Sequence, residues 1–181
     1  MVVSTLGHCK IAGATLPTMY TLHCTRKLLD RFKQPISAAP LAPTTTLGNW
    51  YATVLFWKPQ VALLVNERTL LPVLMPLAPA AKLADFFPAH LTAVLHALGV
   101  DANFIAREVE AMAQSSLAKT ANRSVVGSMN EFSFLAEGYR DVMGTTNLLA
   151  LTLRLADTPC SPIKYSSPVR ALREIVASGV S

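Results

Sequence analysis

The sequence predicts an α+β fold in which the N-terminal half forms a small antiparallel sheet of three to four strands. About five helices from the C-terminal half pack on one face of this sheet. Up to Pro79, apolar residues tend to alternate with other residues, as in strands, whereas after Pro79 they recur every three to four residues, as in helices. Strands that precede the helices along the chain are typical of α+β folds with an antiparallel sheet.

The domain organisation is expected to be simple. No internal repeat and no change of composition marks a boundary, so residues 19–181 are expected to form a single α+β domain. Residues 1–18 are weakly patterned, and the first clear strand pattern begins at Met19. We therefore interpret residues 1–18 as an N-terminal extension that lies upstream of the natural start.

The first strand is expected at 19–24, where Tyr20, Leu22 and Cys24 alternate with polar residues. Thr25 is of a type that caps helices, and it precedes a short helical pattern that runs to about residue 32. A loop rich in Pro, Ala and Thr follows from 34 to 46, and loops of this length often serve as lids or binding segments.

Further strands are expected between residues 50 and 75. An aromatic and β-branched run covers 50–57, and the runs 61–65 and 70–75 form a hairpin around the turn 66–69. Pro72 has no backbone N–H to donate, so the last of these strands is expected at an edge of the sheet or on a bulge.

Five helices are expected after Pro79. The first lies behind Pro88 and ends at Gly99, and Asp101 is placed to cap the second. The third is expected to begin near Ser128, the fourth covers about 146–156, and the fifth begins at Pro168, after Ser167.

The composition is that of a globular protein rather than a disordered or membrane-spanning one. Apolar residues make up 51% of the 181 residues, but the longest apolar stretches fall far short of the ~20 residues of a membrane span. Three cysteines form no disulfide framework, which favours a reducing, cytoplasmic location. The net charge of +5 favours contacts with polyanions, although the Lys and Arg residues are dispersed along the chain.

Motifs of metal and nucleophilic chemistry are largely absent from the sequence. The dipeptides His8-Cys9 and His23-Cys24 contain zinc ligands, but adjacent strand residues point to opposite faces, so we expect no metal site. Neither a Gly-x-Ser-x-Gly nucleophile motif nor a glycine-rich phosphate loop occurs, and no cofactor is expected. These observations favour a protein that is not an enzyme.

The segment 122–132 is the densest polar cluster. Arg123, Ser124 and Asn130 at a helix start are candidates to bind an anion, because free N–H groups and the helix dipole meet there. The alternative is structural: Ser128 and Glu131 match a capping box, with a turn just before them. We give the structural alternative more weight.

A second candidate site is a basic surface formed by Arg26, Lys27 and Arg68. Trp50 and Tyr51 are candidates to supply stacking platforms beside it, as in proteins that bind single strands. The alternative is that this aromatic pair belongs to the core and its rim, with ordinary exposed cations nearby.

Four segments together resemble a bacterial family of unknown function, the domain-of-unknown-function family 6933. They are MYTLHCTRKLL from Met19, TTLGNWYA from Thr45, VNERTLLPV from Val65 and NRSVVGSMNEF from Asn122, and the resemblance covers about residues 19–139. It agrees with a start at Met19 and makes the polar positions of these segments better site candidates. It implies no reaction, cofactor or catalytic residue.

The leading hypothesis is a non-enzymatic binding or regulatory module of the bacterial cytoplasm. It would contact an anionic ligand or nucleic acid through a set of basic and polar residues: Arg26, Lys27, Trp50, Arg68, Arg123, Ser124 and Asn130. The first alternative is an enzyme acting on a nucleotide or RNA, with His23 as acid or base and with Glu67 and Arg123 converging on it. The second is a protein-interaction partner, as a homodimer or as one member of a two-gene module, because the chain is rich in apolar residues and poor in charges.

Overall fold

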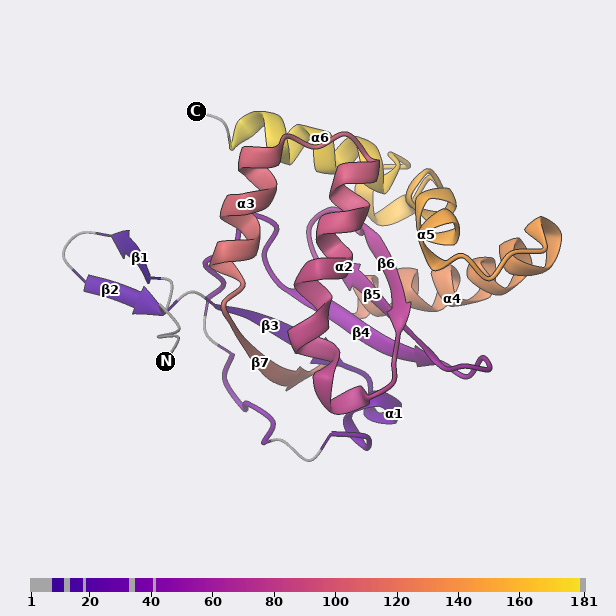
Figure 1. The fold of residues 1–181 in the computed structure, drawn as a ribbon, viewed down its shortest axis with the longest axis horizontal. Helices are drawn as coiled ribbons and strands as arrows, with labels where there is room; N and C mark the ends of the chain where they lie inside the picture. The colour runs from indigo at the N-terminus through magenta and orange to yellow at the C-terminus, as the bar shows by residue number, and fades with distance from the viewer. Residues whose placement is uncertain (1–7, 12–13, 18, 33–34, 41, 180–181) are drawn as a thin grey trace, which may run out of the picture.

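A computed structural model describes residues 8–11, 14–17, 19–32, 35–40 and 42–179. Its centre is a five-stranded sheet in the order β6-β5-β4-β3-β7 (Figure 1). The strands are β3 (Met19–Cys24), β4 (Trp50–Leu55), β5 (Val61–Asn66), β6 (Pro72–Pro76) and β7 (Gln114–Lys119). The α+β class is therefore confirmed, and β6 is an edge strand as Pro72 predicts.

The sheet is mixed, so the prediction of an antiparallel sheet is wrong in part. β4 pairs antiparallel with β5, and β5 with β6, but β3 pairs parallel with both β4 and β7. Parallel neighbours need crossover connections, and two long segments supply them. Residues 25–49 link β3 to β4, and residues 77–113, which contain two helices, link β6 to β7.

β7 is the strand that the sequence pattern does not predict. Its residues Gln114, Ser115 and Lys119 are exposed, whereas the other edge strand, β6, is covered by α2 and α5 and is apolar, so no apolar alternation marks β7. The strand is nevertheless paired with β3 along its whole length, from Gln114 opposite Met19 to Lys119 opposite Cys24.

Helices cover both faces of the sheet, not one face as predicted. The first face packs against α2 (Leu83–Ala97), α3 (Ala102–Ala111) and α6 (Pro168–Ser178), with α1 (Arg26–Leu29) at its side. The second face packs against α4 (Arg123–Met143) and α5 (Leu148–Ala156). The physical reason is that every residue of β4 and β5 is buried, and a strand buried on both sides needs a layer on each.

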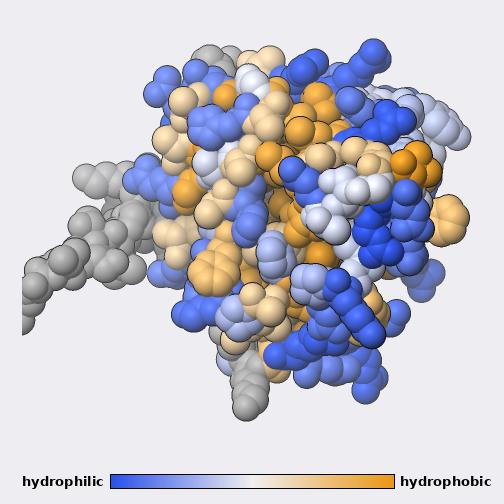
Figure 2. Space-filling view, turned by 45° about the vertical axis from the view of Figure 1, so that its right-hand side comes forward, coloured by the Kyte–Doolittle hydropathy of each residue, from blue (hydrophilic) through white to orange (hydrophobic). Residues whose placement is uncertain are grey.

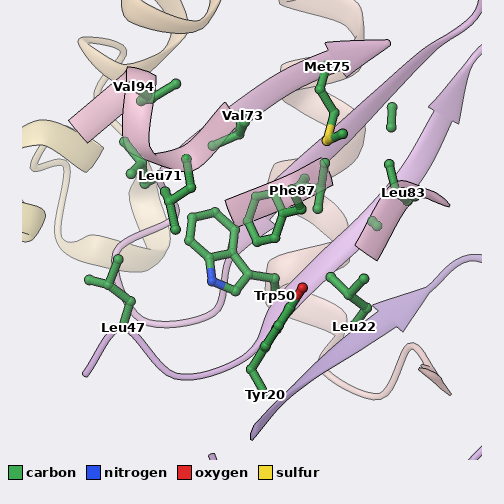
Figure 3. Close-up of a cluster of buried hydrophobic side chains, with 14 of the residues drawn as sticks. Tyr20, Leu22, Leu47, Trp50, Leu71, Val73, Met75, Leu83, Phe87 and Val94 are labelled. Carbon is green, nitrogen blue, oxygen red and sulfur yellow. The ribbon is translucent and has the colours of Figure 1, made fainter. Parts of the chain in front are cut away.

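The core on the first face is built around Trp50. Its ring packs edge-on against Phe87 of α2 with 4.8 Å between centroids, and Figure 3 shows both rings among side chains from β3 and β6. The alternate residues of the same strands, such as Tyr51 of β4 and Leu63 of β5, point to the second face. There Met129 and Phe132 of α4 cover them. Trp50 is therefore a core residue.

Two helix starts differ from their prediction. α2 begins at Leu83 and contains Pro88, which cannot donate to the carbonyl of Ala84; the Tyr20 hydroxyl donates to that carbonyl instead, at 3.3 Å. α4 begins at Arg123, because the Asn122 side chain caps it.

The predicted capping box is therefore wrong. The Asn122 side chain accepts hydrogen bonds from the backbone N–H groups of Ser124 and Val125, at 3.0 and 3.3 Å. Ser128 lies in the second turn of α4, where its hydroxyl donates to the Ser124 carbonyl. The cap at Asp101 and the helix start at Pro168 are as predicted.

The remaining elements are small. Two 3-10 turns, η1 (Ala80–Lys82) and η2 (Ser161–Ile163), precede α2 and α6. The strands β1 (His8–Ile11) and β2 (Ala14–Pro17) pair antiparallel in a sheet of their own, at the left in Figure 1. The rest of the predicted extension, 1–7, 12–13 and 18, lies outside the described residues, as do the side chains of His8 and Cys9.

The surface of the described residues mixes apolar and hydrophilic side chains. On the face drawn in Figure 2, hydrophobic patches lie among strongly hydrophilic ones. The large apolar side chains that are exposed come from several separate elements: Ile36, Phe56, Phe86, Phe134, Val142, Met143, Leu149 and Tyr165. None of the described helices is long and apolar enough to cross a membrane.

Candidate ligand-binding groove

The carboxyl ends of β3 and β7 form the most promising place for a ligand. These strands are parallel neighbours that end together, with Cys24 opposite Lys119. After β3 the chain enters α1, whose Leu28 and Leu29 pack into the core of the first face, and after β7 it enters α4 on the second face. Where neighbouring parallel strands send their connections to opposite faces, a crevice opens at their carboxyl ends, and α/β proteins commonly bind ligands in it.

Three adjoining hollows occupy this place. The His23 hollow, of about 510 Å³, is lined by His23, residues of the segment 36–40 and residues 118–121. The Arg123 hollow is lined by residues 120–123 and by one flank of α4 up to Asn130. The Phe134 hollow lies between α4 and the end of β4, and it includes Lys27 and Phe56.

Neighbouring hollows share lining residues, so the three adjoin one another, and we call them together the groove. Thr120 and Ala121 line both the His23 and the Arg123 hollows, and Asn130 lines both the Arg123 and the Phe134 hollows. The groove therefore runs from the end of β3 along the flank of α4.

His23 is held rigidly at one end of the groove. Its side chain lies on the second face of the sheet and is only 7% exposed. Nδ1 is 3.0 Å from the carbonyl oxygen of Lys119, and because a carbonyl only accepts, Nδ1 carries the hydrogen. Nε2 is then the acceptor of the neutral ring. The ring also stacks on Tyr51, with 4.7 Å between centroids and 17° between planes.

Tyr51 connects this end of the sheet to the start of α4. Its hydroxyl oxygen accepts a hydrogen bond from the Asn122 N–H at 3.2 Å. Burial raises the pKa of Tyr51, and the Asn122 hydrogen bond opposes this rise. Tyr51 is therefore a neutral phenol that fixes the position of both His23 and Asn122.

Cationic side chains lie along the groove. Lys27, Lys119 and Arg123 line it and are exposed. Among the described residues the ion pairs join only Lys82 to Asp85 and Arg140 to Asp141, so none of these three cations is in an ion pair there. One carboxylate, that of Glu137, also lines the Phe134 hollow. The Lys27 ammonium and the Arg31 guanidinium both lie over the Phe56 ring, 5.8 and 5.7 Å from its centroid.

A family model described as "Domain of unknown function (DUF6933)" matches residues 21–171. The chain belongs to this family. The resemblance predicted from the sequence is confirmed, and the match extends past residue 139 through α4 and α5 into α6. Neither the curated proteins nor the solved structures contain a match to the chain.

This DUF6933 chain does not bring all the predicted site residues together. Asn66 pairs with Trp50, the first residue of β4, so the turn that follows β5 lies beyond the amino end of β4 and away from the groove. There Glu67 accepts a hydrogen bond from the Asn49 N–H at 2.8 Å, and Arg68 donates to the Thr46 carbonyl at 2.8 Å. Both side chains hold the loop before β4.

Two predicted constellations are therefore not formed. The basic surface of Arg26, Lys27 and Arg68 is split between the two ends of β4, and Glu67 does not converge with His23. Trp50 is 0% exposed, so its ring cannot stack on a base.

The residues at the start of α4 lie beside the groove, but the first backbone N–H groups of the helix already have a hydrogen-bond acceptor. Arg123 and Asn130 line the groove. The N–H groups of Ser124 and Val125 donate to the Asn122 side chain, so they are not free to bind an anion as predicted. Any anion contact at this DUF6933 site would depend on the Arg123 side chain.

Sequence reasoning missed three residues of the groove. Lys119 lies on β7, which carries no apolar alternation, and Phe56 and Phe134 carry no pattern that distinguishes exposed aromatic residues from buried ones. The thiol of Cys24, on β3, is not activated as a nucleophile. Burial raises the pKa of Cys24 to about 12, so it is a thiol at neutral pH, and no cluster of three metal-ligating side chains occurs among the described residues.

Proposed function

We propose that this DUF6933 chain is a binding protein for an anionic, phosphate-bearing ligand held in the groove. The observation that carries the proposal is that three cations, Lys27, Lys119 and Arg123, line this groove without an ion pair among the described residues, against a single carboxylate, Glu137. Cations that line a hollow focus a positive field in it and attract anions. Asn130, between the Arg123 and Phe134 hollows, adds an amide that can donate to phosphate oxygens.

The proposal keeps Lys27, Arg123 and Asn130 from the predicted site and adds Lys119. It also keeps the expectation of a non-enzymatic module in a bacterial cytoplasm. The support for a reducing compartment is that Cys24 and Cys160 are buried free thiols.

Fluorescence anisotropy with labelled single-stranded RNA and duplex DNA, at low and moderate salt, tests the proposal. We expect binding that weakens as salt rises, because released counterions make phosphate contacts salt-dependent. The Arg123→Glu and Lys119→Glu variants should each lose about tenfold or more in affinity, since a charge-assisted contact becomes a repulsion. Arg107→Glu is the matched control, because Arg107 is exposed on α3, which covers the opposite face. Equal affinities of the Arg123, Lys119 and Arg107 variants for every anion tried would refute the site.

The alternative of an enzyme acting on a nucleotide or RNA is favoured by one observation. His23 has its Nδ1 hydrogen bonded to a carbonyl, which leaves Nε2 as a base at the groove, as in many general acid–base sites. If RNA or nucleotides are converted, the His23→Gln variant should abolish conversion while the His96→Gln variant, altered on an exposed part of α2, keeps it. Conversion that survives His23→Gln would exclude this mechanism.

A further inference from the structure

The His23 hollow differs in chemistry from the rest of the groove. Its walls are mostly small or apolar, with Ile36, Ala38 and Pro40 on one side and Ala118 and Ala121 on the other. Its volume of about 510 Å³ lies within the usual range for small-molecule sites, about 300–1,000 Å³. A hollow with these walls suits a flat apolar group better than a phosphate.

The wall formed by residues 36–40 is attached to the sheet. The Ser37 N–H donates to the Leu117 carbonyl of β7 at 2.7 Å. This bond uses the outer edge of β7 and places the apolar side chains of the segment opposite Ala118 and Ala121. The hollow is therefore formed before any ligand arrives, which lowers the entropy cost of binding.

His23 presents one defined hydrogen-bonding group to the hollow. With Nδ1 bound to Lys119 and the ring stacked on Tyr51, the neutral ring can offer only the Nε2 lone pair. Among the described residues, no hydrogen bond to Nε2 is formed, and Nε2 is not one of the buried side-chain atoms without a partner, so it is open to the hollow. A ligand N–H, such as the ring N–H or the amino group of a nucleobase, can donate to this accessible acceptor.

The neighbouring Arg123 hollow supplies the complementary charge. Thr120 and Ala121 line both hollows, so the two adjoin, and a ligand that fills the His23 hollow and extends past these two residues reaches the Arg123 hollow. A nucleotide has this shape, with a flat heterocycle joined through one sugar to a phosphate.

We propose that the ligand is a nucleoside phosphate, with its base in the His23 hollow against Nε2 and its phosphate at Arg123. This inference rests on the proposed function, because it assigns the class of the anionic ligand. The same chemistry is present in a free nucleotide and in the terminal nucleotide of an RNA strand.

Isothermal titration of the full chain with three sets of ligands tests the inference. The four nucleoside monophosphates carry both groups, ribose 5-phosphate carries the phosphate without a base, and short 5′-phosphorylated RNA oligonucleotides carry the terminal unit. We expect at least one nucleotide, or an oligonucleotide ending in it, to bind ten or more times tighter than ribose 5-phosphate. Tighter binding of the free nucleotide or of the strand then tells which source is preferred.

Two variants separate the base contact from the phosphate contact. His23→Phe keeps a ring over Tyr51 but removes both ring nitrogens, and Ala38→Leu, at an exposed loop position, fills the hollow while leaving His23 and its bond to Lys119 in place. Each should lower the affinity for the nucleotide tenfold, towards that of ribose 5-phosphate, and leave ribose 5-phosphate binding unchanged. His96→Phe is the matched control.

The failures of the two proposals differ in this experiment. If ribose 5-phosphate binds as tightly as every nucleotide and oligonucleotide, or if both variants keep the full preference for the base, the nucleoside inference is overturned while the anion groove stands. If Arg123→Glu also leaves the binding of every phosphate ligand unchanged, the proposed function fails as well.

Discussion

Replacing Glu108 should reveal how the loop before β4 is held. This carboxylate lies on α3, is 2% exposed and accepts hydrogen bonds from the N–H groups of Thr46 and Leu47, at 2.8 and 3.0 Å. In the Glu108→Ala variant the N–H of Leu47, a fully buried residue, loses an acceptor, whereas the exposed Thr46 can bind water. A lost hydrogen bond to a charged group costs about 1.5–3 kcal/mol. Burial of the charged carboxylate offsets part of this stabilisation. We therefore expect Glu108→Ala to lower the free energy of unfolding by about 2 kcal/mol, near the lower end of that range.

The pH dependence of the same site has a defined sign. Burial raises the pKa of Glu108 above its ordinary value of 4.5, and the hydrogen bonds from Leu47 and Thr46 together with the Arg68 charge oppose this rise. A raised pKa in the folded state means that the protonated form favours folding. The stability of the wild type relative to Glu108→Gln, whose amide does not titrate, should therefore be greatest below about pH 4.5 and fall as the pH rises through the raised pKa.

Urea unfolding at a series of pH values measures both effects, with Glu110→Ala on the exposed side of α3 as the control. A stability difference between wild type and Glu108→Gln that grows with pH would refute the reasoning. It would mean that the two amide hydrogen bonds and Arg68 outweigh burial, so that the pKa of Glu108 is depressed.

Three further outcomes follow from the packing and the caps. Asn122→Ala should lower the free energy of unfolding by about 1 kcal/mol, measured with urea, because the cap of α4 is lost. Phe132→Ala, in the buried face of α4, should cost about 3–5 kcal/mol in the same assay, whereas Phe134→Ala, at a side chain that is 77% exposed, should change stability by less than about 0.5 kcal/mol. Cys24 and Cys160 should resist alkylation in the folded protein at pH 8, because burial raises their pKa values to about 12 and about 11, and mass spectrometry of the peptides after labelling would show it.

The sequence predicts the elements of this fold better than their arrangement. Strands β3 to β6 carry an apolar alternation or a nearly continuous apolar run, and all four occur within two residues of the bounds that the pattern predicts. Strand direction is not encoded in such local patterns, because it depends on which strands the crossovers bring together. The nearly continuous apolar runs of β4 and β5, interrupted in β4 by Thr53 alone, indicate two covered faces, since strands with one solvated face alternate.

The start of α4 shows that a local capping motif does not by itself fix where a helix begins. The pair formed by Ser128 and Glu131 has the spacing of a capping box, but Asn122 is an equally good cap and lies next to the end of β7. A start at Asn122 allows Val125 and Met129 to pack on the second face of the sheet. The longer helix buries more apolar surface, and tertiary packing therefore decides between the two caps.

Only individual polar residues of the candidate site were predictable. The strand that brings them together, β7, was not recognised in the sequence. Without β7, His23 is an isolated histidine on a strand, with no partner for Nδ1 and no hollow beside it. With β7 in place, the Lys119 carbonyl sets the tautomer of His23, and Ala118 leaves room over the sheet. The turn after β7 also directs the chain to the second face and brings Arg123 to the same groove. The strand that organises the site is mostly polar, unlike the other edge strand, β6, and a polar strand carries no apolar alternation by which it can be recognised.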